Sequence, residues 1–346
     1  MGTTDGPDVA NSSQRRALLP AGLATGFAAL PHADATAAAH LVLQQTPGLP
    51  SLPALPRRSV EEHSPSRWLR ALPEVVVASD GTIEIDDDAD PDGPLDFSFD
   101  PNAHAGILAF VDLAAKQPRP PARVLAQVTG PLTLGVALSN AGVPEDFAFP
   151  RASRVARGWA RHLEDLVRES IGAQAIIMFD EPDLERWNDD RPPIDHDHAG
   201  DLLSGAFAAV GGPTGVNVGP DGDVRLALSA GPDILGVPVS TSLIADAAGL
   251  GRFLEGGGYI SWGAVPTHRP VGESAAPLWK SLVDLWCELS RRGCDGLSLR
   301  TQAIISPASG LDGHGVGQAE HALALARELA GRVFDQAAAT KLTVGA

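Results

Sequence analysis

The sequence is poor in cysteine, in basic residues and in long apolar runs. Its 346 residues include only two cysteines, which excludes a disulfide framework and leaves little sulfur for a metal site. Lysine and arginine total 26 against 43 acidic residues, and the net charge of −17 argues against nucleic acid as a partner, because phosphate binding needs a basic surface. No stretch approaches the roughly 18 apolar residues of a membrane span, so we expect no membrane partner.

Targeting and dinucleotide-binding signals are absent as well. Residues 1–16 are polar and contain no apolar run of the kind that a secretory signal peptide has, so we predict a disordered tail and a reduced, cytoplasmic setting. No early strand is followed by Gly-x-Gly-x-x-Gly, which removes the main motif support for a dinucleotide-binding open sheet.

What the sequence does contain is an alternation of short apolar runs with Ala/Leu-rich segments of helical periodicity. This alternation implies a parallel sheet with helices outside it, and seven or eight such units favour a single (β/α)8 TIM barrel, placed at 17–335 with a C-terminal tail at 336–346. The predicted strands are Gly22–Phe27, Val124–Val128, Ala175–Phe179, Gly215–Val218, Ile234–Val239, Tyr259–Ala264 and Ala303–Ile305, with Leu52–Leu55 as a further candidate. The predicted helices are Asp34–Gln45, His104–Lys116, Leu132–Asn140, Ala152–Ser170, Ala199–Val210, Thr241–Leu254, Ala275–Arg292 and Gly317–Val333.

One segment, residues 74–100, departs from this alternation. Two short strands, Glu74–Ala78 and Thr82–Asp86, are joined by an Asp-Gly turn signal, which predicts a β-hairpin insertion. From Asp80 to Asp100 there are nine acidic residues and no lysine or arginine. Just over half of the net charge therefore lies in a segment that we interpret as a solvated loop.

Polar residues follow several predicted strands, at the edge where a (β/α)8 barrel forms its functional site. Asp180 and Glu181 come directly after a buried strand, where two acids are costly to desolvate unless they are used. Helix capping is the structural alternative for both acids. Thr129 opens a Thr-Gly-Pro turn that places backbone N–H groups and a hydroxyl at a helix start.

Five of these strand ends resemble motifs of the cobalamin-independent methionine synthases, in the same order across residues 20–333. The wider superfamily also holds the uroporphyrinogen decarboxylases. The matching segments are Gly26-Phe27-Ala28-Ala29-Leu30-Pro31, Gln127-Val128-Thr129-Gly130-Pro131, Met178-Phe179-Asp180-Glu181-Pro182, Trp262-Gly263-Ala264-Val265-Pro266-Thr267 and Ser306-Pro307-Ala308-Ser309-Gly310-Leu311.

The resemblance implies a (β/α)8 barrel and methyl transfer to a homocysteine-like thiol. It implies that Asp180 contacts the amino group of the substrate and that Glu181 orients Asp180 or caps a helix. It further implies an amino-acid thiol as ligand and a corrinoid or other methyl-donor protein as partner. The residues expected to line the substrate pocket are Phe27, Gln127, Thr129, Trp262, Thr267 and Ser309.

The chain departs from the family pattern at the zinc ligands. The family holds zinc with a His and a Cys two apart, a Glu after the next strand and the Cys of the last motif. Those positions correspond here to Asn217, Gly219, Pro238 or a residue next to it, and Ser309. Glycine and proline have no side-chain donor, and Asn and Ser are poor zinc ligands, so we expect no zinc or other cofactor at this site.

Other candidate metal ligands lie elsewhere in the sequence. Cys287 and Cys294 are seven residues apart on one face of a predicted helix, and we expect them to be packed or partly exposed helix residues, since a free cysteine packs as a small apolar residue. His196 and His198 stand in an Asp-rich segment that we predict to be a polar loop.

Three functions stay open from the sequence. The first is a divergent methionine-synthase-like protein that retains a small-molecule pocket but not zinc–thiolate chemistry. The second is a non-catalytic binding or partner protein. The third is a metal-free decarboxylase-like enzyme, which needs pocket arginines for substrate carboxylates; the candidates are Arg57, Arg58, Arg269 and Arg300.

Overall fold

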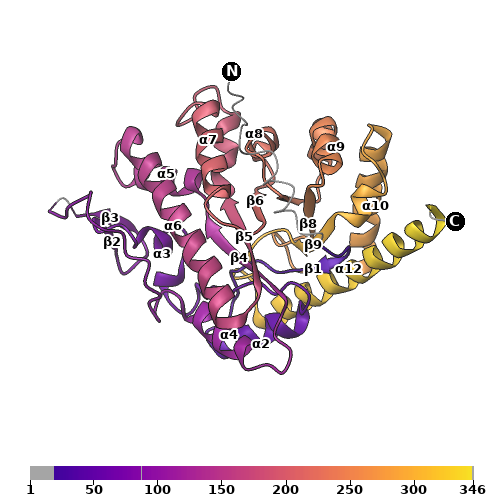
Figure 1. The fold of residues 1–346 in the computed structure, drawn as a ribbon, viewed down its shortest axis with the longest axis horizontal. Coiled ribbons are helices and arrows are strands. Elements are labelled where there is room, and N and C mark those ends of the chain that lie inside the picture. Colours follow the sequence, from indigo (N-terminus) through magenta and orange to yellow (C-terminus); the bar gives the residue numbers. More distant parts are fainter. Residues whose placement is uncertain (1–18, 87, 345–346) are drawn as a thin grey trace, which may run out of the picture.

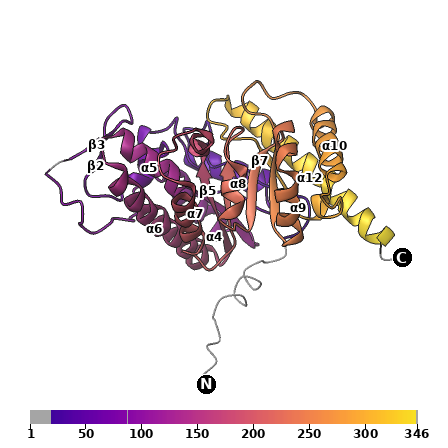
Figure 2. The same ribbon diagram turned by 90° about the horizontal axis from the view of Figure 1, so that it is seen from above.

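The computed structural model describes residues 19–86 and 88–344, so the predicted tail at 1–16 lies outside the described residues. The main sheet of this part of the chain has seven parallel strands in the order β1-β9-β8-β7-β6-β5-β4, and it curls so that helices cover its outer face (Figures 1 and 2). The predicted α/β architecture with a parallel sheet is therefore confirmed. The strands are β1 (Leu23–Ala24), β4 (Arg123–Thr129), β5 (Gln174–Glu181), β6 (Thr214–Val218), β7 (Ile234–Pro238), β8 (Tyr259–Val265) and β9 (Ala303–Pro307).

The helices alternate with these strands along the chain. The α-helices are α2 (Ala35–Gln45), α3 (Ser66–Leu69), α4 (Ala105–Ala115), α5 (Pro131–Asn140), α6 (Glu145–Ile171), α7 (His196–Phe207), α8 (Val224–Ser229), α9 (Ala247–Glu255), α10 (Ala275–Arg291), α11 (Ser298–Thr301) and α12 (Val316–Val344). Short 3-10 helices are η1 (Val60–Glu62), η2 (Pro182–Asn188) and η3 (Thr241–Asp246). The predicted C-terminal tail begins at residue 336, inside α12. None of the described helices is both long and apolar enough to cross a membrane.

Aspartates define where several helices begin. The carboxylate of Asp34 accepts the backbone N–H groups of Thr36 and Ala37 at the start of α2. Asp223 does the same at the start of α8, and Asp195 accepts one N–H at the start of α7. Because the first N–H groups of a helix have no partner within the helix, each such cap stabilises its helix by about 1 kcal/mol.

The predicted hairpin is also present. Strands β2 (Val75–Val77) and β3 (Ile83–Ile85) pair antiparallel, apart from the main sheet. Gly81 in the turn has φ of +88°, a conformation that favours glycine. Figure 1 shows the hairpin on the flank of the molecule, beside α3.

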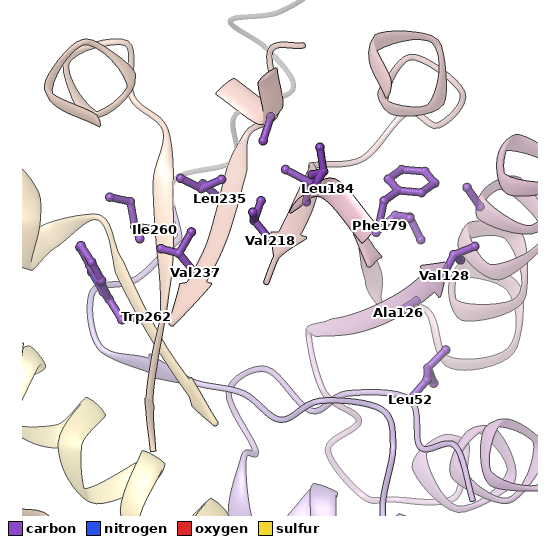
Figure 3. Close-up of a cluster of buried hydrophobic side chains, with 14 of the residues drawn as sticks. Leu52, Ala126, Val128, Phe179, Leu184, Val218, Leu235, Val237, Ile260 and Trp262 are labelled. Carbon is purple, nitrogen blue, oxygen red and sulfur yellow. The ribbon is translucent and has the colours of Figure 1, made fainter. Parts of the chain in front are cut away.

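Successive residues of each strand face opposite sides of the curled sheet, and this divides the core in two. On the inner side, Leu125, Ile176, Met178, Ile234, Tyr259 and Ile304 form a small buried cluster with Leu19 and Leu49. The alternate residues of the same strands belong to the larger core beneath the helices. Figure 3 shows part of that outer layer, with Val128, Phe179, Val218, Val237 and Trp262 from five neighbouring strands.

The segment that contains the candidate strand Leu52–Leu55 reaches both edges of the sheet. Ser51 forms a parallel bridge with Leu125 of β4, and Ala54 forms one with Ala29, which follows β1. The backbone N–H of Leu52 donates to Leu125 at 2.9 Å. On the other side, the N–H of Ala54 donates to Ala28 at 2.7 Å. This segment therefore stands between the first and the last strand of the seven.

Candidate functional site

Strand register brings the polar site residues into one row at the C-terminal edge of the sheet. Thr129 of β4 pairs with Asp180 of β5, Asp180 pairs with Asn217 of β6, and Asn217 pairs with Gly236 of β7. Asp180 lies two residues beyond Met178, which belongs to the inner cluster, so the alternation of the strand turns its side chain toward the inner face.

Two amide side chains hold the Asp180 carboxylate. The Nδ2 of Asn217 donates to Oδ1 of Asp180 at 2.5 Å, and the Nε2 of Gln127 donates to the same oxygen at 3.4 Å. The side chain of Asn217 occupies the space beside Gly236. A Cβ on Gly236 would come within 1.9 Å of Asn217 Oδ1, so this packing requires glycine. Asn217 is thus oriented toward Asp180 by the absence of a side chain on the next strand.

Burial sets the protonation of Asp180. Desolvation raises the pKa of its carboxyl to about 7, against the hydrogen bond from Asn217 and the charge of Arg67, which both act to lower that pKa. The carboxyl of Asp180 therefore titrates near neutral pH. It can give or take a proton, or pair with a cation, near pH 7.

Glu181 has a different environment from its neighbour. Its side chain is fully buried, and its two carboxylate oxygens accept the N–H groups of Leu132 at 2.9 Å and Thr133 at 2.7 Å, in the first turn of α5. A Cβ on Gly130, the cap residue of α5, would come within 2.2 Å of Glu181 Oε1, so the close approach depends on that glycine. The structure thus places Glu181 as a cap of α5, the helix that follows β4, and away from the inner face.

Gln127 and Thr129 lie with Asp180, as the sequence predicted. Gln127 is buried, and its Oε1 accepts the N–H of Ala28, in the chain that follows β1. The hydroxyl of Thr129 shares a short hydrogen bond with the hydroxyl of Ser64. Ser64, Thr129 and Asp180 line a cavity of about 410 Å³.

The other predicted pocket residues make contacts of their own. Trp262 is fully buried in the outer core, where its ring lies 6.2 Å from that of Trp286 in α10. Thr267 and Ser309 form a hydroxyl pair of their own at 2.5 Å, beyond the ends of β8 and β9. Phe27 lies half-buried in the chain after β1.

A buried arginine joins the site from a part of the chain that gave no sequence signal. Arg67 of α3 is 3% exposed, and its charge is felt at Asp180 and at Glu62. Burial lowers the pKa of its guanidinium to about 10, so it stays charged at neutral pH. The arginines proposed from the sequence lie elsewhere; Arg57, Arg58 and Arg269 are exposed, and Arg300 bonds to Gln336 and Gly296.

The positions that the family resemblance assigns to zinc do not fit the metal. The amide of Asn217 donates to Asp180, and the hydroxyl of Ser309 pairs with that of Thr267. Gly219 and Pro238 supply no side-chain donor. Both line a separate cavity of about 480 Å³. Within the described residues, no three His, Cys, Asp or Glu side chains come together as a metal site.

Two predictions, one about the histidines and one about the cysteines, were wrong. His196 and His198 lie in the first turn of α7, not in a loop, because Asp195 caps that helix. Cys294 lies beyond the end of α10, where its thiol is buried and donates to the carbonyl of Ala247 at 3.2 Å, while Cys287 on α10 is exposed. The two cysteines therefore do not share a helix face.

The fold is similar to that of solved B12-independent methionine synthases. The structure of a B12-independent methionine synthase from Shewanella sp. W3-18-1 in complex with selenomethionine matches with a TM-score of 0.60 at 14% identity, over 93% of this chain and 100% of that chain. A putative vitamin-B12-independent methionine synthase from Listeria monocytogenes matches with a TM-score of 0.54 at 11% identity, over 86% and 85%. No protein-family model and no curated protein matches the chain. The resemblance expected from the five motifs is confirmed at the level of the fold, which is similar to that of the B12-independent methionine synthases.

Proposed function

We propose that this chain binds a small molecule with an amino group at the C-terminal edge of its sheet, as a divergent relative of the methionine synthases without zinc–thiolate chemistry. The observation that carries the proposal is Asp180, a carboxylate held by Asn217 and Gln127 on the wall of a cavity. The solved Shewanella protein is in complex with selenomethionine, which has such an amino group. We extend that ligand class to this chain, with a homocysteine-like thiol or its thioether as the first candidates.

We also propose that the curled sheet closes into a complete (β/α)8 barrel. We infer that residues 51–54 are its eighth strand, because this segment hydrogen bonds to β4 on one side and to the chain after β1 on the other. An eight-stranded ring has an interior that side chains fill, with the ligand site at the C-terminal ends of the strands.

The chemistry expected of Asp180 follows from its environment. A protonated amine that enters the cavity pairs with the carboxylate and lowers the pKa of Asp180 from about 7. Because the carboxyl titrates near pH 7, binding at that pH is expected to release protons. Gln127 and Asn217 keep the acceptor oxygen in place, and the hydroxyls of Thr129 and Ser64 offer further hydrogen bonds on the same wall.

Calorimetric titration with L-homocysteine and L-methionine tests this proposal. We expect saturable binding, with proton release near pH 7 that shows as a dependence of the enthalpy on the buffer. Asp180→Asn removes the charge and is expected to abolish both the binding and the proton release. Asp183→Asn is the matched control, since Asp183 lines the same cavity but pairs with Arg186 at 3.2 Å.

Metal analysis and a methyl-transfer assay on homocysteine complete the test. Stoichiometric zinc together with methyl transfer would overturn the claim that zinc–thiolate chemistry is lost. No binding of either compound, or binding that Asp180→Asn leaves unchanged, would overturn the role of Asp180.

A non-catalytic binding or partner protein is the second candidate. It is supported by the side chains at the four positions that the resemblance assigns to zinc, of which Asn217 and Ser309 are engaged with other residues. Binding without turnover in the same experiments would select it. The decarboxylase-like alternative has less support, because no arginine is among the described residues that line the Asp180 cavity.

A further inference from the structure

The cavity beside Asp180 has acidic side chains on its wall but no basic ones. Asp180 and Asp183 both line it, and none of the described lining residues is a lysine, an arginine or a histidine. Asp183 pairs with Arg186 at 3.2 Å, whereas the hydrogen bonds to Asp180 come from the neutral amides of Asn217 and Gln127. The wall of the cavity therefore carries an acid that the other lining residues do not neutralise.

The backbone around the cavity does not replace a basic side chain. Helix α5 begins there, with Thr133 of its first turn among the lining residues. The start of a helix often binds anions, because its first N–H groups have no partner within the helix. Here the N–H groups of Leu132 and Thr133 already donate to Glu181. The N–H of Asp183 donates to the hydroxyl of Thr133 at 3.4 Å. A ligand carboxylate would therefore meet a helix start that an acid already fills.

Arg67 does not alter this balance for a ligand. Its charge acts on Asp180, but Arg67 is not among the residues that line the cavity. Two of its nitrogens, Nε and Nη1, are closed to solvent, and its guanidinium stacks on the ring of Trp68 with Cζ 4.0 Å from the ring centre. Arg67 thus offsets part of the charge of Asp180 through the protein, without lining the space that a ligand would occupy.

Much of the remaining wall is apolar. The apolar lining residues are Pro65, Val136, Ala137 and Pro182. Such a wall suits an alkyl or thioether chain, which gains free energy when it leaves water. A carboxylate moved to the same place would lose its hydration without gaining an ionic partner from the wall, and burying an unpaired charge is costly.

We propose that this cavity selects a cationic amine that carries no carboxylate, such as an aminothioether, over an amino acid. The inference rests on the proposed function and names the class of amine that the site takes. In an α-amino acid one carbon bears both groups, so the carboxylate lies close to Asp180 whenever the amine pairs with it. There it meets the like charge of Asp180 and no basic side chain from the described wall. An amine without the carboxylate keeps the ion pair and avoids this repulsion.

Calorimetric titration of the full chain with three ligands tests the inference. The compound 3-(methylthio)propylamine is methionine without its carboxylate, and L-methioninol has a neutral hydroxymethyl group of similar size in its place. At pH 8 the carboxyl of Asp180, with its pKa of about 7, is mostly ionised, and the amines of L-methionine and of both analogues are largely protonated. We expect both carboxylate-free amines to bind about 10- to 100-fold more tightly than L-methionine.

A lysine placed at the cavity should reduce this preference. Asn140 is an exposed lining residue at the end of α5, where a cation is favoured. Asn140→Lys is expected to tighten the binding of L-methionine and to lower the ratio of affinities about 3- to 10-fold. Gln44→Lys is the matched control, because it adds the same charge at an exposed amide near the end of α2, outside the cavity lining. It should keep the ratio of the parent chain.

The possible results separate the inference from the proposed function. Equal affinities for the three ligands, or tighter binding of L-methionine, would overturn the inference and leave the binding of an amine at Asp180 standing. Tighter binding of 3-(methylthio)propylamine alone, with L-methioninol no better than L-methionine, would show exclusion by size and would overturn the inference as well. If none of the three ligands binds, the proposed function fails and the inference fails with it.

Discussion

Asp180 and Glu181 are neighbours at the end of one strand, yet they serve opposite sides of the sheet. Asp180 follows the inner residue Met178, lines a cavity and is held by two amide side chains. Glu181 follows the outer residue Phe179 and closes the first turn of α5. Burial raises the pKa of both carboxyls to about 7.

The pair shows that a shifted pKa does not by itself identify a functional group. Desolvation is the main cause in both residues, so the shift reports burial and says nothing of the direction in which the carboxyl points. The two acids differ in their partners. Glu181 accepts backbone N–H groups of a helix, whereas Asp180 accepts side-chain amides beside a cavity. The difference can be tested by substitutions on each side.

The largest expected effect is on the outer side, at Trp262. Trp262→Ala removes a fully buried indole from the core beneath α10 and is expected to lower the free energy of unfolding by about 3–5 kcal/mol. Ligand affinity per folded molecule should stay unchanged. Chemical denaturation and calorimetric titration measure the two quantities, and a loss of affinity at full stability would place Trp262 at the ligand after all.

The next effect concerns Glu181. Glu181→Ala leaves the N–H groups of Leu132 and Thr133 buried without acceptors, so we expect the free energy of unfolding to fall by about 2–4 kcal/mol. Glu181→Gln retains one acceptor oxygen and should lose less. Equal stability of Glu181→Ala and the parent chain in urea denaturation at pH 6 would contradict the capping role.

The smallest effect is a pH dependence on the inner side. The carboxyl of Asp180 gives up its proton near pH 4 when the chain is unfolded and near pH 7 when it is folded, so the folded state binds more protons in between and stability falls as pH rises through that window. Since the residue is partly open to the cavity, we expect the loss to be about 2 kcal/mol. Asp180→Asn should reduce the slope of the stability curve from pH 4 to 8 and leave the part that Glu181, whose pKa is also raised to about 7, contributes. An unchanged slope would show that Asp180 does not have the raised pKa.

The order of elements and the polar strand ends were predictable from the sequence, since they depend on local periodicity. The opposite directions of Asp180 and Glu181 were predictable as well, because strand residues alternate between faces. The same count from Ile260 assigns Trp262 to the outer side, where the structure has it. The sequence interpretation ended the strand at Phe179 and so grouped Asp180 with Glu181, which the strand itself separates.

Other features depend on tertiary structure and were not predictable. Arg67 lies in a helix of four residues, and its burial follows from contacts with Trp68 and its neighbours that no local pattern encodes. Helix α6 was predicted from Ala152, whereas it begins at Glu145, continues through Pro150 although proline is disfavoured inside a helix, and buries Ala148 and Phe149.

The contact between Asn217 and Asp180 has a consequence for how such a chain could change over evolutionary time. The resemblance assigns four positions to zinc, and a single substitution at any of them adds one donor, which does not hold a zinc ion. Exchanging Asn217 for histidine would also take the amide away from Asp180. A first step toward such a ligand set at Asn217 therefore gives up a hydrogen bond to Asp180 before enough donors are present to hold a metal ion.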